Sequence, residues 1–338
     1  NSTYVGGLVG YSSSTANITG ASTTGTVTGT ANYVGGLVGQ MYTGNSTVSN
    51  SFATGNVQGT YGVGGLVGYM DLNYTRTIDQ NSYAQGTVVG TATGNGYVGG
   101  LVGAIYGYLN INSSSYRGAG VTSAGSGVGG LLGQNLYRDT YIRNSYVNIA
   151  GATGVQGTFF VGGMVGYNGA GLTIQSDGSN TAVYGAALSP YSNAKVTATG
   201  NTSNNACVGG IVGCSSQYTS STATINDTSF TGTSVTGPGA YVGGLIGYSY
   251  SLNANNSYVN GAIISGTGAS NISQYVGGLV GGAYYSTISN GYVNSPGISA
   301  TGGYVGGLVG FANVSANVTN TYVNSNITTT GTSYVGGL

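Results

Sequence analysis

The sequence has no His, no Glu and no Trp, and it contains only two Cys and three Pro. Ten of its 338 residues carry a formal charge, and these charges cancel. Without His, the sequence excludes a Ser-His-Asp triad, a Cys-His pair and an imidazole metal site. Five Lys and Arg residues cannot form the basic patch that nucleic-acid binding requires. Polar residues and Gly interrupt every uncharged stretch, which predicts that this chain has no transmembrane segment.

The sequence is rich in Gly and Tyr, with 68 and 30 residues respectively, and 40% of it is hydrophobic. This hydrophobic content at zero net charge argues against intrinsic disorder, because disordered chains combine low hydrophobicity with high net charge. Gly does not recur at every third position and Pro is scarce, so the chain is not collagen-like. The chain must therefore fold, or aggregate.

A six-residue segment, Val-Gly-Gly-Leu-Val-Gly at residues 5–10, recurs along the whole chain in near copies. Its eleven copies begin at Val5, Val34, Val63, Val98, Val128, Val161, Val208, Val242, Val276, Val305 and Val335. A second element lies between copies and consists of Asn or Ser followed by Tyr or Phe, as in Ser51–Phe52, Asn144–Tyr146 and Ser229–Phe230. A short Thr, Ile or Val run, such as Thr47–Val48, precedes it.

These three short runs, separated by Gly, Asn, Ser and Thr, predict three β-strands per unit. No window has the apolar spacing of a helix, and Gly in helix interiors costs about 1 kcal/mol per residue. A unit of about 30 residues cannot bury its own apolar face, so neighbouring units must stack. The sequence predicts an all-β fold, a parallel β-helix (β-solenoid) of about eleven repeats and about 50 Å length. We expect one continuous array over residues 1–338, with a longer irregular unit at 167–206.

Two arrangements of the six-residue segment are open. Strict alternation would place Val5 and Val9 on one face and Leu8 on the other, which would leave a ladder of Val on the outside of the rod. Alternatively, the segment bends and hides both sets in one core. In either case, Gly would permit a close approach of sheets or a bulge.

The Val-Gly-Gly-Leu-Val-Gly run followed by an Asn-Ser-Tyr run resembles the GLUG repeat of large bacterial and archaeal surface and secreted proteins, including adhesin-like chains. The resemblance covers essentially all 338 residues. It implies a stalk or scaffold in a larger protein and says little about a specific activity. The chain departs from the pattern in the unit from Val161 to Ala206, where the spacing from one Val to the next is 47 residues, and where Cys207 and Cys214 replace Tyr.

Candidate catalytic residues are few. Some β-helical enzymes act on polysaccharides through Asp and Arg, so Asp71, Arg76 and Asp79 are candidates, although a local ion pair is the simpler interpretation. Arg138, Asp139 and Arg143 receive the same structural interpretation. Two Gly-x-Gly-x-x-Gly matches open no helix, and most turns lack the Asp of repeated calcium sites. We therefore expect no catalytic residue, no cofactor and no metal site.

Cys207 and Cys214 lie seven residues apart in one predicted extended run. Such a run would separate them by about 20 Å, which excludes a disulfide unless the chain bends sharply. We interpret them as two small buried residues. A bond between them remains the alternative.

Asn-x-Ser/Thr sequons are numerous, and glycans on them would hydrate a chain that has so few charges. The first begins at Asn1. The other eleven, the candidate glycosylation sites, begin at Asn17, Asn45, Asn73, Asn112, Asn201, Asn226, Asn255, Asn271, Asn313, Asn317 and Asn326.

Tyr recurs in register just before the Val of the six-residue segment. Stacked turns would bring these rings into a ladder, with structural stacking as the main role and sugar binding as the sharper use. The candidate ladder consists of Tyr4, Tyr33, Tyr97, Tyr241, Tyr275, Tyr304 and Tyr334.

All ten charges lie between Asp71 and Asp227, and near-zero net charge favours association. The chain begins and ends beside copies of the segment, which we interpret as a piece of a longer chain or a filament subunit. We predict an extracellular or cell-surface structural protein that self-associates in a filament, sheath or stalk. An adhesin or carbohydrate-binding rod that presents the loop at 175–194 is the alternative. A polysaccharide-acting enzyme using Asp71 and Asp79 is a third.

Overall fold

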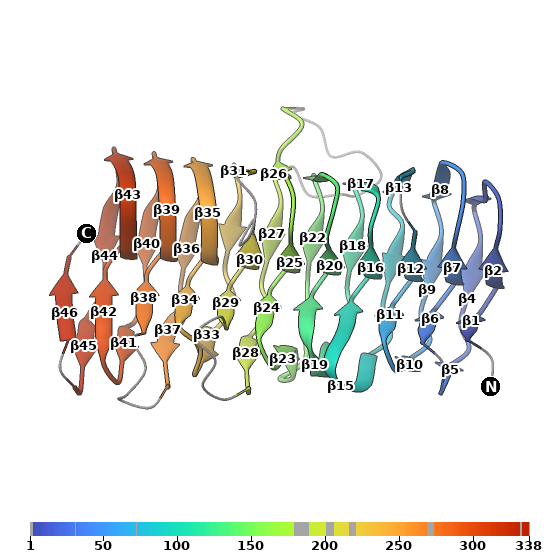
Figure 1. The fold of residues 1–338 in the computed structure, drawn as a ribbon, viewed down its shortest axis with the longest axis horizontal. Helices are drawn as coiled ribbons and strands as arrows, with labels where there is room; N and C mark the ends of the chain where they lie inside the picture. The colour runs from blue at the N-terminus through green and yellow to red at the C-terminus, as the bar shows by residue number, and fades with distance from the viewer. Residues whose placement is uncertain are drawn as a thin grey trace.

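The protein is a parallel β-solenoid. The computed structural model describes residues 3–30, 32–71, 73–178, 189–200, 206–215, 221–268, 274–331 and 333–337. In Figure 1 the turns stack along a rod, the strands run across its long axis, and the two termini lie at opposite ends. The strands form three sheets in which equivalent strands of successive turns pair in parallel. The predicted all-β solenoid is therefore confirmed.

Within the described residues, the three sheets, here called A, B and C, contain 19, 17 and 10 strands. Sheet A contains β1 (Tyr4–Gly6), β5 (Val27–Thr28), β6 (Tyr33–Gly35), β10 (Val57–Gly59), β11 (Gly62–Gly64), β15 (Val88–Gly99), β19 (Gly120–Gly129), β23 (Gly154–Gly157), β24 (Phe160–Gly162), β28 (Val196–Ala198), β29 (Cys207–Gly209), β33 (Ser234–Gly237), β34 (Tyr241–Gly243), β37 (Ile263–Gly266), β38 (Tyr275–Gly277), β41 (Ile298–Ala300), β42 (Gly303–Gly306), β45 (Ile327–Thr329) and β46 (Ser333–Gly336). Sheet B contains β2 (Val9–Ser12), β3 (Asn17–Thr19), β7 (Val38–Met41), β8 (Ser46–Ser49), β12 (Val67–Met70), β13 (Thr75–Asp79), β16 (Val102–Ile105), β17 (Tyr108–Asn112), β20 (Leu132–Asn135), β21 (Thr140–Arg143), β25 (Val165–Asn168), β26 (Leu172–Gln175), β30 (Val212–Ser215), β31 (Thr222–Asn226), β35 (Ile246–Asn255), β39 (Val280–Ser289) and β43 (Val309–Thr319). Sheet C contains β4 (Ser22–Thr23), β9 (Phe52–Ala53), β14 (Tyr83–Ala84), β18 (Ser115–Tyr116), β22 (Tyr146–Val147), β27 (Tyr191–Ser192), β32 (Ser229–Phe230), β36 (Tyr258–Asn260), β40 (Tyr292–Asn294) and β44 (Tyr322–Asn324).

Each turn contributes one strand to sheet C, so the described residues form ten complete turns, and β46 starts the next. With strands about 4.8 Å apart, ten turns make a rod about 50 Å long. No helix of the described residues is long and apolar enough to cross a membrane.

The six-residue segment folds back on itself instead of running straight. In the second turn, β6 ends at Gly35 and β7 begins at Val38, with a bend between them. Val34, Leu37 and Val38 are all fully buried in one core. The bent arrangement is therefore correct, and an outer ladder of Val does not form. The same core runs without interruption from Ile18 to Leu308.

Gly lets the two arms of this bend touch backbone to backbone. A Cβ atom on Gly35 would lie 1.9 Å from the carbonyl oxygen of Val38 and 2.7 Å from the amide nitrogen of Gly68. A Cβ atom on Gly68 would lie 2.6 Å from the amide nitrogen of Val34. Neither Gly has a positive φ, so these positions require Gly for space and not for backbone freedom. We call this contact between the arms the glycine seam.

The Asn-Ser-Tyr run forms the corner between sheets B and C. Asn50, Asn144 and Asn256 have positive φ values of 47°, 47° and 50°, a conformation that Asn tolerates better than most residues. Ser51 follows and is fully buried. Its Oγ donates to the carbonyl oxygen of Ser49 (2.8 Å) and accepts from the amide nitrogen of Ala21 (3.1 Å) in the preceding turn. The corner therefore satisfies its polar groups without charge.

The aromatic residue of this run does not always point outward. Phe230 pairs with Ser192 and Val259 of the adjacent turns and is fully buried. The Ser229–Phe230 pair is therefore shifted by one residue relative to the other copies of this run: Ser229 lies at the register position of Tyr146, and Phe230 at that of Val147. The reason is that Ser229 takes the outward position, and a one-residue shift moves a side chain to the opposite face of a strand.

Candidate functional site

A stack of Tyr rings lies beside the glycine seam in the last turns of the rod. Tyr241, Tyr275, Tyr304 and Tyr334 have successive ring-centroid distances of 5.1, 5.2 and 4.9 Å, with nearly parallel planes. Burial raises the pKa of Tyr241 to about 12, with the neighbouring Tyr275 and Tyr284 hydroxyls adding to the effect. The Tyr241 ring is therefore partly dehydrated, whereas the Tyr334 ring at the end of the stack is exposed.

The same position in earlier turns is interrupted. Tyr4 and Tyr33 stack at 5.9 Å, but Gly62 occupies the next position, and the Tyr33 ring packs instead on Tyr69 at 4.3 Å. Tyr97 makes an edge contact with Tyr61 at 5.1 Å. The seven predicted Tyr residues thus lie in three groups along the rod, because Gly and other residues separate them.

A second set of side chains lies across the mouth of the seam from the first. These partners stand seven residues later and touch the first set across the bend, as in Phe160 with Tyr167 (5.1 Å) and Tyr241 with Tyr248 (4.7 Å). A ring pair therefore closes the seam on its outer side in these turns.

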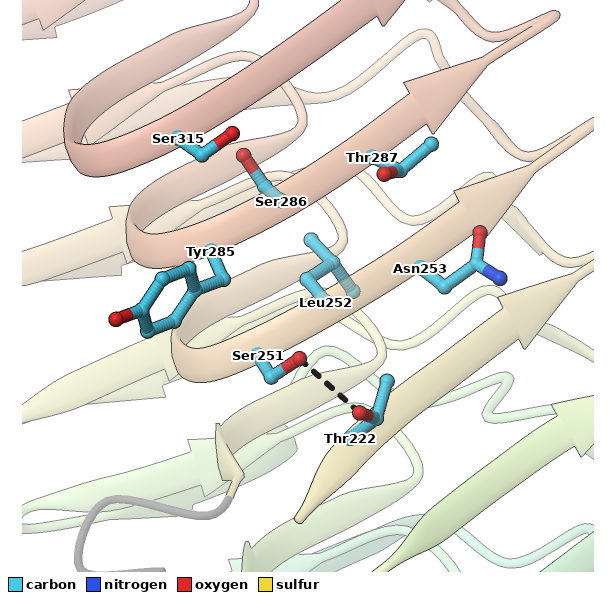
Figure 2. Close-up of a pocket in the computed structure, with 8 residues that line it drawn as sticks. All are labelled: Thr222, Ser251, Leu252, Asn253, Tyr285, Ser286, Thr287 and Ser315. Carbon is cyan, nitrogen blue, oxygen red and sulfur yellow. Dashed lines mark hydrogen bonds between the residues drawn. The ribbon is translucent and has the colours of Figure 1, made fainter. Parts of the chain in front are cut away.

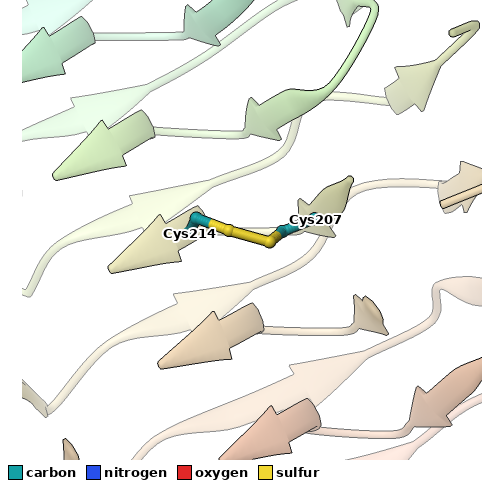
Figure 3. Close-up of a disulfide and its surroundings, with 2 residues drawn as sticks. All are labelled: Cys207 and Cys214. Carbon is teal, nitrogen blue, oxygen red and sulfur yellow. A yellow bond between two sulfur atoms is a disulfide. The ribbon is translucent and has the colours of Figure 1, made fainter. Parts of the chain in front are cut away.

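Cys207 and Cys214 replace one such ring pair with a disulfide. Their Cα atoms are 5.5 Å apart, and Figure 3 shows the bond joining the strands on the two sides of the bend. Cys207 pairs with Tyr241 and Cys214 with Tyr248 of the next turn. Our expectation of two unbonded Cys in an extended run is therefore wrong, because the bend brings residues seven apart together.

We expect the Cys207→Ser/Cys214→Ser double variant to lose about 2.5 kcal/mol of stability in chemical denaturation. This figure is the chain-entropy value for closing a loop of about eight residues. The matched control is the untouched chain with and without reductant, which should reproduce the loss. Equal denaturation midpoints for oxidised and reduced protein would show that the disulfide does not stabilise the fold.

A separate aromatic ladder follows the outer side of sheet C, and sequence analysis did not recognise it as a ladder. Its stacks join Phe52 to Tyr83 (5.0 Å), Tyr146 to Tyr191 (5.0 Å), and Tyr258 to Tyr292 to Tyr322 (4.6 and 5.2 Å). The recurrence of Tyr in the Asn-Ser-Tyr run was the signal that could have predicted it. Strand register was needed to show which rings face outward.

Arg117 fills one gap in the sheet C ladder. Ser115 stands where the neighbouring turns have Tyr83 and Tyr146. The Arg117 guanidinium carbon lies 4.8 Å from the Tyr83 ring centroid and 5.4 Å from that of Tyr146. The guanidinium also donates to the side-chain oxygen of Asn81 at 2.7 Å. A cation between two rings thus continues the ladder where a ring is missing.

The remaining three Arg residues also lie over Tyr rings. Arg76 is above Tyr74, Arg138 above Tyr108 and Arg143 above Tyr141, with distances of 5.1 to 5.5 Å to the ring centroids. Arg138 donates to the Asn73 side chain (3.2 Å), whereas the Asp139 carboxylate accepts from the amide nitrogen of Gly171 (3.1 Å). These contacts are structural.

The structure places Arg76 and Asp79, two of the three candidate residues, on opposite faces of β13. Arg76 is fully buried and donates to the carbonyl oxygens of Tyr42 (3.1 Å) and Gly44. Burial lowers the pKa of Arg76, and Asp71 partly offsets this. Asp79 lies three residues further along β13, about 10 Å away, and its side chain points to the opposite face.

In the part of the chain that the structure describes, no three His, Cys, Asp or Glu residues are grouped so as to hold a metal ion. The sequons at Asn17, Asn45, Asn73, Asn313, Asn317 and Asn326 are exposed, and those at Asn112, Asn226 and Asn255 are half-buried. Asn1, Asn201 and Asn271 lie outside the described residues.

The longer unit at 167–206 keeps the regular strand pairing on both sides of its extra residues. Its β26 pairs with β21 and β31, and its β27 pairs with β22 and β32. Much of the loop at 175–194 lies outside the described residues. The extra length is therefore accommodated between β26 and β27 without breaking the stack.

The architecture is that of a repeat solenoid whose outer surface is made of aromatic, hydroxyl and amide groups. Comparison with known proteins shows that residues 1–28 and 30–58 each match the family described as "The GLUG motif". The chain therefore carries the GLUG motif that its sequence resembles. A stretch of 73 residues is 52% identical to halomucin of Haloquadratum walsbyi, covering 20% of this chain and 1% of halomucin. No solved structure matches the chain.

Proposed function

We propose that this chain is a non-enzymatic structural rod of a cell-surface or extracellular layer, which associates side by side with other copies. The observation that carries the proposal is the single apolar core and the repeated strand pattern that continue through ten turns, with few charged residues. A surface without a net charge lacks the repulsion that keeps soluble proteins apart.

Two further observations support a location outside the cell. The Cys207–Cys214 disulfide is typical of oxidising compartments. The GLUG motif and the similarity to a protein named halomucin suggest a surface repeat protein, since mucin-like segments form glycosylated stalks. Glycans on the exposed sequons would supply the hydration that charged residues provide in other proteins.

Antibody labelling of intact source cells tests the location. We expect an antibody raised against the purified chain to label unpermeabilised cells, whereas an antibody against a cytosolic protein labels only permeabilised ones. Labelling of this chain only after permeabilisation would contradict a surface role. Electron microscopy of the purified chain tests association: we expect rods aligned side by side, and isolated short rods at every concentration and salt level would rule it out.

The alternative functions have weaker support. An adhesin that uses the loop at 175–194 depends on residues that lie mostly outside the described part. A polysaccharide-acting enzyme would need Asp71 and Asp79 on one substrate, and Arg76, its third candidate residue, is fully buried.

A further inference from the structure

An open pocket lies on sheet B towards the C-terminal end of the rod (Figure 2). Its lining comes from four successive turns and includes Thr222 on β31, Ser251 and Asn253 on β35, and Tyr285 and Thr287 on β39. The strand pairing shifts register between Ala283 and Tyr285, where β39 meets β43. This irregularity interrupts an otherwise even sheet beside the pocket.

The pocket offers one aromatic ring and several uncharged polar groups. The Tyr285 side chain is 41% exposed, and its ring is supported from behind by an edge contact with Tyr250 at 5.6 Å. Tyr250 in turn stacks on Tyr284 at 5.5 Å. The Thr222 and Ser251 hydroxyls share a hydrogen bond of 3.0 Å, drawn in Figure 2. The exposed ring is thus fixed in place by packing.

One buried hydroxyl in the lining lacks a partner. Ser286 is only 6% exposed, and its Oγ makes no hydrogen bond within the protein. A buried polar group left in this state costs about 1 to 3 kcal/mol. In the equivalent position the neighbouring turns carry the apolar Leu252 and Ala316. Because Leu252 belongs to the hydrophobic core, the Ser286 side chain faces that core, on the opposite face of β39 from Tyr285 and Thr287, and its hydroxyl is closed to a ligand in the pocket.

We infer that this pocket binds a neutral oligosaccharide. The ligand's apolar ring face would rest on Tyr285, and its hydroxyls would exchange hydrogen bonds with Ser251, Asn253 and Thr287. None of the lining residues is charged, so the pocket provides no compensation for desolvating a charged ligand. The same chemistry is offered by a free polysaccharide and by glycans attached to protein. Sugar binding at this pocket does not depend on the proposed side-by-side association of rods.

The test is calorimetric titration of the whole chain with maltohexaose, cellohexaose, mannohexaose and chitotetraose. We expect at least one of them to bind, with an affinity that does not change with salt. Tyr285→Ala should weaken that binding about tenfold, because an aromatic contact contributes about 0.5 to 1.5 kcal/mol beyond area burial. Ser286→Ala should leave binding unchanged, because this hydroxyl faces the core, and should leave the unfolding temperature unchanged or higher, since the change removes an unpaired buried hydroxyl.

Tyr322→Ala is the matched control, because Tyr322 is 58% exposed on sheet C, away from the pocket, and its loss should leave binding unchanged. Absence of binding by all four sugars would overturn the inference, as would equal losses in the Tyr285 and Tyr322 variants.

Comparing glycosylated chain from the source cells with bare recombinant chain shows whether the bound sugar is a glycan attached to protein or a free polysaccharide. Binding only by bare chain identifies an attached glycan as occupant, and binding by both identifies a free polysaccharide. Cell labelling and micrographs report on the structural role separately.

Discussion

The Gly99→Ala variant should be strongly destabilised, by about 3 kcal/mol or more, although the substitution adds only one methyl group. The added Cβ would lie 1.9 Å from the carbonyl oxygen of Val102 and 2.8 Å from the amide nitrogen of Gly133. Overpacking usually costs about 1 to 3 kcal/mol when side chains can move aside. Here the obstacles are backbone atoms of the glycine seam in a central turn, which cannot move without displacing strands of the adjacent turns.

Gly297→Ala is the matched control. A Cβ atom there would have its nearest neighbour at 3.9 Å, and Gly297 has no positive φ. Replacing such a Gly restricts the unfolded chain, so we expect no loss and up to about 1 kcal/mol of gain. Scanning calorimetry of both variants measures the difference. Because turns of a solenoid are coupled only to their neighbours, Gly99→Ala should also split the unfolding transition. Equal unfolding temperatures for the two variants would show that the seam is not tightly packed.

Stability should remain constant from about pH 6 to about pH 9 and fall steeply between about pH 10 and about pH 12. The chain has no His, and its two Cys are bonded, so little titrates near neutrality. Burial raises the pKa of Tyr241 to about 12 in the folded state, against an ordinary value near 10. Between these values the unfolded chain has lost the proton that the folded chain retains. The stabilisation is therefore complete below pH 10 and lost as the pH rises through 12.

The pKa values of several other Tyr residues are shifted in the same direction, which makes the expected fall in stability large. Burial raises the pKa of Tyr33, Tyr69, Tyr97 and Tyr248 as well. Urea midpoints measured across the pH range, together with tyrosinate absorbance, check the prediction. Tyr241→Phe keeps the ring and removes the ionisable group, so its midpoint should fall less between pH 10 and pH 12. Midpoints that stay flat to pH 12 in the untouched chain would contradict buried, neutral Tyr ladders.

The sequence and the structure agree most closely where the repeat is regular. The spacing of the Val-Gly-Gly-Leu-Val-Gly copies predicted parallel turns, since each copy must pair with the next to bury its apolar side chains, and Val34 does pair with Val5 and Val63. The gaps in the Tyr ladder could be anticipated only in part. Gly62 breaks it by lacking a ring, but the resulting contact of Tyr33 with Tyr69 depends on the second arm of the bend.

By itself, the sequence determined the class of fold, the number of repeats, the near absence of charge and the absence of His and Glu. These follow from composition and period, which do not depend on how any one side chain points. Only the tertiary structure decided the rest: the inward bend at Gly35, the Cys207–Cys214 bond, the buried Phe230 and the unpartnered hydroxyl of Ser286. The physical reason is that each depends on the register between turns and on a bend that brings residues seven positions apart into contact. A one-dimensional repeat specifies that its units stack, but contacts across a fold in the chain are set in three dimensions.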